Sequence, residues 1–348
     1  MVSNKLEDDL TAILERGAPL WPVLKGARFF ITGGTGFIGT WLLESLVWLN
    51  EHLELDMHAV VLTRNADAFK LKAPHIANHT GITLLSGDVR DFTFPEGKFT
   101  IVIHGATDAS AKLNAEDPIR MFDTIVEGTR RTLDFAVQSG AKRFLFLSSG
   151  AVYGEQPSHI RHTSETDRNG PDCASTGSAY AEGKRTAELL CVLYAKQHGL
   201  DAKLARCFAF VGPHLPLDSH FAIGNFIRDA MAKGTIQVNG DGTPYRSYLY
   251  AADLTLWLWT VLVNGKTAIP YNVGSDEAIS IGELASLVDR TLGGGGIDIR
   301  EKPRADIPPK RYVPSVTRAK TELGLEQSTT LEQAIIKTAR WHGWKEHI

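Results

Sequence analysis

The sequence predicts an α/β fold in which a doubly wound parallel sheet carries a smaller C-terminal region. Three observations lead to this prediction. Short apolar segments alternate with helical segments from residue 28 to about residue 212. The apolar segments are apolar on both faces, as parallel strands covered by helices on both sides must be. A glycine-rich turn joins the first of these strands to the first helix.

The predicted strands are residues 28–32, 58–63, 82–88, 99–106, 143–149 and 202–212. The main helices predicted between them are residues 38–50, 117–138 and 178–198. After residue 213 the elements become shorter, with turn signals in "GDGTPYRS" and "PYNVGSDE". This part is predicted to lie over the carboxyl edge of the sheet, where open α/β sheets bind ligands.

Before the first strand, residues 4–16 place Leu6, Leu10, Ile13 and Leu14 on one helical face, which predicts a packing helix. The predicted organisation is therefore an N-terminal helical extension, a sheet domain to which a later segment returns, and a substrate-binding region in two pieces. The predicted boundaries are 1–25 for the extension, 26–212 with 249–275 for the sheet domain, and 213–248 with 276–348 for the substrate-binding region.

Composition excludes several classes of protein. The chain has 348 residues, of which 43% are hydrophobic, so it can bury a large core. A formal net charge of -3 gives no reason to expect nucleic acid or an anionic membrane as partner. The three cysteines lack CxxC spacing and predict reduced thiols and no metal site. With no secretory signal pattern and no long apolar run, a cytoplasmic protein is expected.

The stretch "FFITGGTGFIGTWLLE", residues 29–44, places Gly33, Gly36 and Gly39 between a strand and a helix. Glycines allow a tight turn and a close approach of backbone to a pyrophosphate. The amino terminus of the helix then presents free N–H groups and a positive dipole end to the anion. Because the turn also begins a strand–helix series, it predicts a dinucleotide site of the Rossmann type.

The end of the second strand bears on the choice of dinucleotide. NAD sites usually place Asp or Glu there to hold the ribose 2′-hydroxyl, whereas this chain has Thr63, Arg64 and Asn65. An arginine can pair with a 2′-phosphate, which favours NADP and leaves NAD as the alternative. Asp88, after the third strand, is predicted to accept from the adenine amino group.

A hydride-transfer centre is predicted from "LSSGAVYG" and "SAYAEGK". Tyr180 and Lys184 are four residues apart, so they lie on one face of the predicted helix. A neighbouring ammonium favours the phenolate, so we expect Lys184 to lower the pKa of Tyr180. Ser149, at the carboxyl end of the fifth strand, can hydrogen-bond a reacting hydroxyl or carbonyl.

These motifs resemble the extended short-chain dehydrogenase/reductases, in particular the nucleotide-sugar epimerase/dehydratase branch. The resemblance runs from about residue 26 to 343 and rests on the order and spacing of "TGGTGFIG", "GDVRD", "HGAT", "LSSGAVYG", "YAEGK", "RCFAFVGP", "IGNFIRDA", "GDGTPYRSYLYAADL", "YNVGS" and "LGL…LEQAI…TARW". It implies bound NAD(P), hydride transfer at C4 of a nucleoside-diphosphate sugar, and a homodimer packed through residues 117–138 and 178–198.

The resemblance also implies roles for individual residues. Tyr180 matches the general base, Lys184 the residue that binds the nicotinamide ribose, and Ser149 the hydroxyl partner. Sugar nucleotide contacts are expected from Asp108, Ser149, Asn225, Arg246 and Arg311, of which Asn225 and Arg246 hold the diphosphate. The expected cofactor site consists of Gly33, Gly36, Phe37, Ile38, Gly39, Thr63, Arg64, Asp88, Val89, Ala106, Tyr180 and Lys184.

Departures from the family pattern indicate the reaction. Where related dehydratases carry an Asp-Glu pair and UDP-glucuronate decarboxylases keep the Glu, this chain has Gly150 and Ala151. Neither side chain can move a proton, so the pattern is closer to 4-epimerases and 4-ketoreductases. Ile125 and Ala209 replace two family asparagines, which indicates an altered sugar pose.

Three interpretations remain open from the sequence. The first is a 4-epimerase or 4-ketoreductase acting in sugar-nucleotide biosynthesis, with NADP favouring the reductase. The second is a dehydratase or decarboxylase in which Asp108 or Glu155 replaces the missing acid, although binding of a sugar hydroxyl is the favoured role of Asp108. The third is a non-catalytic NADP-binding protein, against which the intact Ser149, Tyr180 and Lys184 argue.

Overall fold

The computed structural model describes residues 4–107, 111–219, 221–304 and 306–345. The chain divides into two compact units. Unit 1 consists of Met1–Val152, Pro171–Cys207 and Thr255–Tyr271, and unit 2 consists of Tyr153–Gly170, Phe208–Leu254 and Asn272–Ile348. Within the described ranges, no helix is long and apolar enough to cross a bilayer.

Unit 1 is built on a seven-stranded sheet with the order β11-β6-β5-β4-β1-β2-β3. From β6 to β3 in this order, every pair of neighbouring strands is parallel. The strands are β1 Arg28–Thr32, β2 His58–Thr63, β3 Ile82–Ser86, β4 Ile101–His104, β5 Arg143–Ser149, β6 Asp201–Cys207 and β11 Pro270–Val273. The chain winds outward from β1 to β3 and then from β4 to β6. The order therefore reverses between β1 and β4, where doubly wound sheets bind their ligands.

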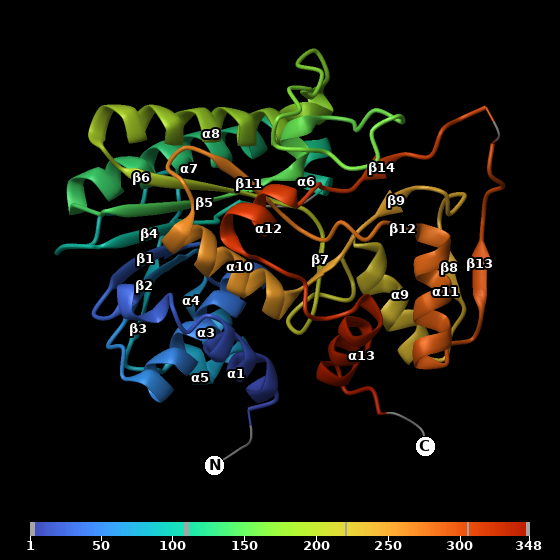
Figure 1. Cartoon of the computed structure of the whole chain (residues 1–348), viewed down its shortest axis with the longest axis horizontal. Coiled ribbons are helices and arrows are strands. Elements are labelled where there is room, and N and C mark those ends of the chain that lie inside the picture. The colour runs from blue at the N-terminus through green and yellow to red at the C-terminus, as the bar shows by residue number, and fades with distance from the viewer. Residues whose placement is uncertain (1–3, 108–110, 220, 305, 346–348) are drawn as a thin grey trace. The chain divides into compact units, whose positions relative to one another are not determined.

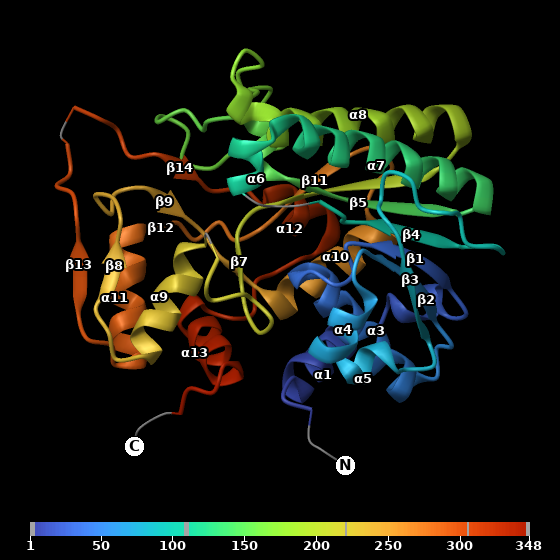
Figure 2. The ribbon, with the colours of Figure 1, turned by 180° about the vertical axis from the view of Figure 1, so that it is seen from behind.

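Helices cover both faces of this sheet. Figures 1 and 2 show α7 and α8 on one face and α3, α4 and α5 on the other. The helices that begin in unit 1 are α1 Glu7–Arg16, α2 Trp21–Leu24, α3 Phe37–Leu53, α4 Ala66–Lys72, α5 Pro74–Ala77, α6 Ala111–Glu116, α7 Pro118–Ser139 and α8 Ala179–His198, with the short 3-10 turns η1 Gly150–Tyr153 and η2 Thr176–Ser178. Helix α10, Ala251–Asn264, begins in unit 2 and continues into unit 1.

The predicted doubly wound sheet is confirmed, and β1, β2 and β5 have the predicted ends. The predicted strand 202–212 is wrong as a single element. It divides into β6, in the large sheet, and β7 Phe210–Val211, which pairs with β10 in unit 2. Since the unit boundary falls after Cys207, the apolar run beyond it serves a different core.

The core of unit 1 contains an aromatic cluster formed by Phe30, Phe92, Phe99 and Phe135. The Phe30 ring centroid lies 5.1 Å from that of Phe92 and 4.5 Å from that of Phe135. The cluster holds the centre of the sheet to the α7 side. Aromatic pairs at these separations add stabilisation beyond the area that they bury.

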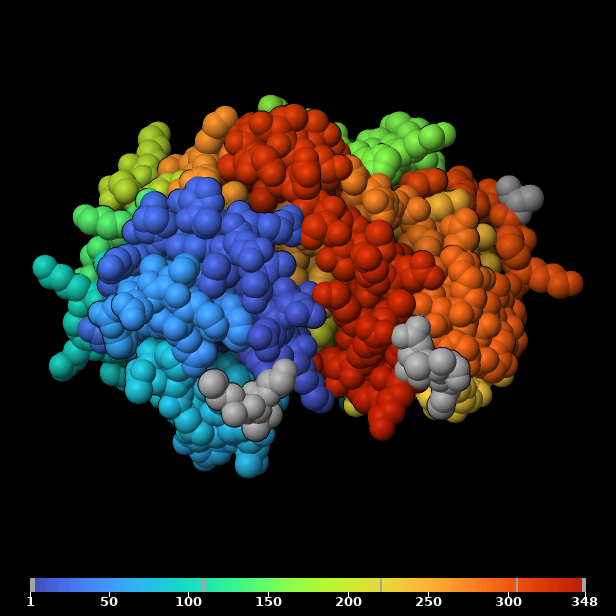
Figure 3. All heavy atoms as spheres, turned by 60° about the horizontal axis from the view of Figure 1, so that its bottom comes forward, coloured from blue at the N-terminus to red at the C-terminus, as the bar shows by residue number. Residues whose placement is uncertain are grey.

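The N-terminal segment is part of unit 1 and packs as a helix, as predicted. Leu6, Leu10 and Ile13 are buried. Trp21 donates its indole N–H to the Leu14 carbonyl at 2.7 Å, and its ring meets Trp259 edge to face at 6.4 Å. Figure 3 shows the blue atoms of this segment beside the light-blue atoms of α4 and α5 on one face.

Unit 2 contains three small sheets, with the orders β10-β7, β12-β9-β14 and β13-β8. Its remaining strands are β8 Ile236–Val238, β9 Tyr245–Arg246, β10 Leu249–Tyr250, β12 Ile279–Ser280, β13 Ile297–Ile299 and β14 Arg311–Tyr312. Its remaining helices are α9 Ala222–Met231, α11 Ile281–Leu292, α12 Thr317–Leu323 and α13 Leu331–Trp341.

Residues 153–170 cluster with unit 2, although the sequence placed them in the sheet domain. Buried hydrogen bonds explain the difference. Asn272 donates to the Thr163 carbonyl at 2.9 Å, and the Glu165 carboxylate accepts from the Asn272 backbone N–H at 2.9 Å. The Gln156 side chain accepts from Val313 N–H at 3.0 Å. These long-range contacts leave no local signal in the sequence.

Candidate active site

The turn after β1 has the shape of a phosphate cradle. Gly33 has a φ of +73°, and a Cβ there would lie 2.5 Å from the Gly105 backbone. A Cβ at Gly39 would overlap the Gly33 carbonyl oxygen. At Gly36 the nearest atom would be 3.4 Å away, so this position leaves room above the turn. Two glycines therefore close the turn, and the third keeps open the space that a pyrophosphate requires.

Helix α3 begins directly at this space. Its N-cap is Gly36, and no side chain caps its first turn. The first backbone N–H groups of Phe37, Ile38 and Gly39 consequently have no intrahelical acceptor. Together with the helix dipole they offer an anion site, so the cradle fits the diphosphate of a dinucleotide.

The end of β2 adjoins the same turn. The Thr63 hydroxyl lies 3.5 Å from the Thr35 hydroxyl and accepts from Asn65 N–H at 3.3 Å. Arg64 is the next residue, and its charge helps to lower the pKa of Asp88, for which the hydrogen bond from Arg90 is the larger cause. The parallel β1–β2 and β2–β3 pairs thus bring Arg64 and Asp88 to one edge.

Two cofactor predictions change in detail. Both Asp88 carboxylate oxygens already accept from Arg90, at 2.9 and 3.1 Å, so an adenine amino group would share this carboxylate. The Val89 side chain is buried and faces Gly128 of α7, which leaves only its backbone for the cofactor. Ala106 donates its N–H to the Thr32 hydroxyl at 3.2 Å, at the edge shared by β1 and β4.

The predicted hydride-transfer residues come together between β5 and α8. The Ser149 hydroxyl lies close enough to the Tyr180 side chain to affect the pKa of its phenol. The Lys184 ammonium lies 6.0 Å from the centroid of the Tyr180 ring and donates to the Leu147 carbonyl at 2.8 Å. Lys184 is 2% exposed and Ser149 7% exposed, so little water competes for these groups.

The expected lowering of the Tyr180 pKa by Lys184 is wrong for this structure. Burial raises the pKa of Tyr180, and the nearby Ser149 hydroxyl only partly offsets it. Burial also lowers the pKa of Lys184 to about 8. Desolvation is therefore the largest cause of both pKa shifts, and neither group is among the causes of the other's shift. The Tyr180 phenol keeps its proton at neutral pH and is ready to donate it.

Sequence reasoning missed the residues that hold this centre in place. Asn114 of α6 accepts from Tyr180 N–H at 3.0 Å and donates to the Gly177 carbonyl at 2.9 Å, which fixes the start of α8. One turn beyond Lys184, Glu188 accepts from the Ser148 hydroxyl at 2.6 Å and from Arg206 of β6 at 2.7 Å. The sequence signal that could have identified Glu188 was a carboxylate four residues after a lysine on a predicted helix.

Other polar groups surround the same strand ends. The His104 imidazole is buried between the Thr32 and Thr129 hydroxyls at 2.6 and 2.9 Å, and burial lowers its pKa to about 3. Burial raises the pKa of the Cys207 thiol, opposite Ser149, to about 12, so it supplies no thiolate. Within the described ranges, the buried Thr107 hydroxyl lacks a hydrogen-bond partner and is a further candidate contact.

The positions that depart from the family pattern have structural roles. Gly150 and Ala151 begin η1, and Ala151 contributes only a backbone N–H, which donates to the Ser149 hydroxyl at 3.2 Å. Ile125 is buried in α7 against Gly183 of α8, where a Cβ would lie 3.2 Å from it. Ile125 therefore sets the α7–α8 packing beside the active centre.

Asp108 and Glu155 are the proposed replacement acids, and the structure describes only the second of them. Asp108 lies outside the described residues. Glu155 belongs to unit 2, where its carboxylate pairs with Lys310 at 3.1 Å and its side chain is 73% exposed. Within its own unit Glu155 is therefore an exposed, ion-paired side chain.

The predicted diphosphate-binding residues all lie in unit 2. The parallel β9–β14 pair aligns Arg311 with Tyr245 and Tyr312 with Arg246. The Arg311 guanidinium lies 4.1 Å from the Tyr245 ring centroid, and that of Arg246 lies 5.9 Å from the Tyr312 ring centroid. Two arginines and two aromatic rings thus form one small surface. Asn225 lies on α9, where it accepts from Arg228 at 3.2 Å.

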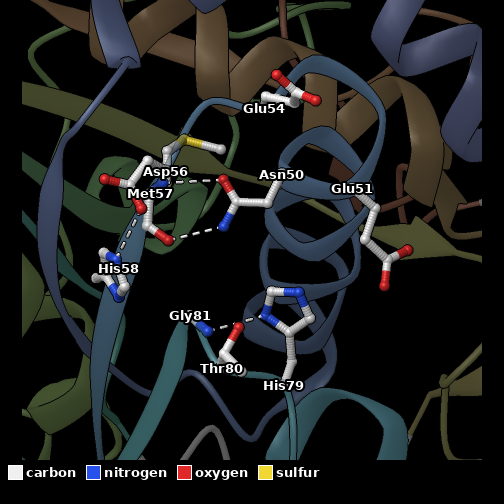
Figure 4. A pocket seen from close by; sticks show the side chains of 9 residues that line it. All are labelled: Asn50, Glu51, Glu54, Asp56, Met57, His58, His79, Thr80 and Gly81. Carbon is white, nitrogen blue, oxygen red and sulfur yellow. Dashed lines mark hydrogen bonds and ion pairs between the residues drawn. The ribbon is translucent and has the colours of Figure 1, made fainter.

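A polar hollow of about 300 Å³ at the amino end of β2 is not part of this centre (Figure 4). Some of its polar groups pair with one another. Asn50 bridges the Met57 backbone N–H and carbonyl at 2.9 and 2.7 Å, and His58 pairs with Asp56 at 3.1 Å. No group of three or more His, Cys, Asp or Glu could hold a metal ion in the part of the chain that the structure describes.

Comparison with known proteins identifies the family. The model of the NAD dependent epimerase/dehydratase family matches residues 29–274. The chain belongs to this family. It is therefore an enzyme that uses a cofactor of the NAD family and modifies nucleotide sugars.

Relatives within the NAD dependent epimerase/dehydratase family differ in their named activities. UDP-glucuronic acid decarboxylase 1 of Xenopus tropicalis is 31% identical over 90% of this chain and 72% of its own length. The structure of UDP-glucose 4-epimerase from Thermotoga maritima aligns with a TM-score of 0.76 at 22% identity, covering 90% of this chain and 98% of that one. The dTDP-glucose 4,6-dehydratase DesIV from Streptomyces venezuelae, with NAD bound, also gives 0.76 at 22% identity, covering 90% and 96%. The last two likenesses support the fold.

Proposed function

We propose that this enzyme transfers a hydride at C4 of a nucleoside-diphosphate sugar, and that it acts as a 4-ketoreductase. One observation carries the proposal: the partly buried Tyr180 lies beside the buried Ser149 and Lys184, whereas Gly150 and Ala151 next to Ser149 provide no side-chain acid or base. Redox at C4 needs the first set only. Elimination or decarboxylation needs further proton-transfer groups within hydrogen-bond reach of the substrate.

The protonated Tyr180 phenol suits the reductive half of a hydride transfer. A nicotinamide cofactor supplies or accepts the hydride when bound. Because burial raises the pKa of Tyr180, its phenol holds the proton that the C4 oxygen must receive when a ketone becomes an alcohol. The Ser149 hydroxyl lies beside Tyr180 and can orient the same oxygen.

The cofactor proposed for this reductase is NADP. Arg64 stands where NAD sites usually carry a carboxylate, and Asn65 uses its side chain to cap α4 by accepting from Ala68 N–H at 2.9 Å. A 2′-hydroxyl would find no carboxylate acceptor at the end of β2, while a 2′-phosphate would meet a guanidinium.

Most of the proposed sugar-nucleotide contacts belong to unit 2. We propose that Arg246 and Arg311 pair with the diphosphate and nucleotide, since guanidinium groups bind phosphate oxygens in a bidentate manner. Asn225 and Asp108 are proposed as further polar contacts of the substrate. Removing Arg246 should raise KM for the sugar nucleotide more than it lowers kcat, because the residue acts in binding.

A panel of UDP-, CDP-, GDP- and dTDP-sugars, including 4-keto-6-deoxy sugars, tests the reaction by product mass. A gain of about 2 mass units with oxidation of NADPH supports the ketoreductase. Inversion at C4 without a mass change would replace it by the second candidate, a 4-epimerase, which needs the same three residues. A loss of water or carbon dioxide would overturn both, and would make the activity that of the dehydratase or decarboxylase relatives.

A homodimer through α7 and α8 is also proposed. Apolar side chains remain exposed along the outer side of α8, where Leu189 is 57% and Leu193 40% exposed, and at Ile119 of α7, which is 73% exposed. Sedimentation of a Leu189→Glu/Leu193→Glu variant should show a monomer. Leu53→Glu, at an exposed position of α3, is the control that should leave the dimer intact. A wild-type monomer would contradict this proposal.

A further inference from the structure

Lys72, the last residue of α4, reaches back to the glycine turn. Its ammonium donates to the Thr35 carbonyl at 3.3 Å. Thr35 lies between Gly34 and Gly36, and its hydroxyl is 3.5 Å from that of Thr63 at the end of β2. Lys72 therefore approaches the edge at which Arg64 begins the β2–α4 connection, although the two residues are separated along the chain.

The charged residues near Lys72 form ion pairs that do not include Lys72. Its neighbour Lys70 is paired with Asp67 at 2.9 Å. Asp88 is held by Arg90 at 2.9 Å. Among the residues that the structure describes, no carboxylate lies within ion-pair distance of Lys72 itself. Burial lowers the pKa of Lys72, so its charged form would gain from an anion nearby.

The chemistry of this position suits a phosphate. An ammonium has three donors, and the Thr35 carbonyl uses one of them. A phosphate monoester carries close to two negative charges at neutral pH and has several acceptor oxygens, whereas a ribose hydroxyl carries no charge. Lys72 is a cation without a carboxylate partner at the adenosine end of the cradle. It would therefore bind a ribose 2′-phosphate in preference to a ribose 2′-hydroxyl.

We propose that Lys72 is a second determinant of cofactor specificity, which binds the ribose 2′-phosphate of NADP together with Arg64. The inference rests on the proposed use of NADP and deepens it. Arg64 supplies a planar fork at the end of β2, and Lys72 supplies a point charge from the end of α4. The α4 helix thereby becomes part of the cofactor site, a role that the fold alone does not require.

Binding of adenosine 2′,5′-bisphosphate and of 5′-AMP, measured by calorimetry at one fixed salt concentration, tests this role without turnover. The variant is Lys72→Gln. The matched control is Lys70→Gln, which removes the same charge from the same helix but at a lysine paired with Asp67. We expect Lys72→Gln to weaken the bisphosphate by about tenfold and to leave 5′-AMP unchanged. Lys70→Gln should bind both ligands as wild type does.

The possible outcomes distinguish a failure of the proposed choice of NADP from a failure of the proposed role of Lys72. If wild type binds the bisphosphate no more tightly than 5′-AMP, the choice of NADP fails, and the role of Lys72 with it. If wild type discriminates and Lys72→Gln discriminates equally, NADP stands and Lys72 is overturned. A parallel loss of both ligands in Lys72→Gln would also overturn it, because Lys72 would then only shape the turn. An unchanged thermal midpoint shows that the variant is folded.

Discussion

Two neighbouring parts of the chain at the carboxyl end of β5 differ in whether they carry reactive side chains. Ser149 lies beside Tyr180, and Lys184 and Glu188 follow Tyr180 at one-turn intervals along α8. The next two residues after Ser149, Gly150 and Ala151, offer only backbone groups. Adjacent positions of one strand end can therefore be complete for redox and empty for elimination. This contrast is the basis of the proposed reaction, and variants on either side can break or sharpen it.

The largest effect is expected at Tyr180. In the proposed reaction Tyr180 gives its proton to the C4 oxygen, so Tyr180→Phe should lower turnover by about 10² to 10⁴. Cofactor affinity should stay the same because the glycine turn and Lys184 remain. Tyr194→Phe is the control, since this tyrosine lies on the same helix but bonds Asp134. Full turnover in Tyr180→Phe would break the comparison by removing Tyr180 from the chemistry.

The next largest effect is expected at the ion pair between Glu188 and Arg206. Glu188→Gln leaves the Arg206 guanidinium, whose side chain is 14% exposed, without its carboxylate. Denaturant titration should show a loss of about 3 kcal/mol in the free energy of unfolding. Glu182→Gln, on the same helix at a more exposed pair with Arg185, should cost much less. Equal costs would mean that Glu188 does not support the active centre more than a surface residue does.

The buried ammonium of Lys184 predicts a dependence of stability on pH. Its pKa is about 8 in the folded chain and 10.5 in the reference state, so between these values the unfolded chain binds the extra proton. Stability of wild type relative to Lys184→Met should therefore rise as pH increases from about 8 to about 10.5, by up to about 3 kcal/mol. A flat difference across this window would show that the Lys184 charge is well solvated.

A smaller effect is expected at Asn114, which positions Tyr180 without taking part in the chemistry. Asn114→Ala leaves the Tyr180 N–H without its acceptor, so stability should fall by about 1 kcal/mol. The kcat should fall and KM should stay nearly constant, because the start of α8 loses its anchor. Asn114→Asp keeps an acceptor oxygen and should recover most of the kcat. If it recovers nothing, the hydrogen bond to Tyr180 is not what matters.

The sequence by itself determined the elements that local signals encode. Apolar segments and glycine spacing predicted the sheet, the cofactor turn and the ends of several strands. The one-turn spacing of Tyr180 and Lys184 predicted their shared face, and the motif order predicted the family. These predictions hold because each depends on residues that are close together in the chain.

Only the tertiary structure decided the features that depend on contacts between distant segments. Burial, which no local pattern reports, reversed the expected direction of the Tyr180 pKa shift. Pairing with Asn272 drew residues 153–170 into unit 2. The approach of Lys72 to Thr35 and of Asn114 to Tyr180 likewise arises from the packing of separate helices. Desolvation and long-range hydrogen bonding exist only once the chain has folded, so the sequence could name the groups but not their environments.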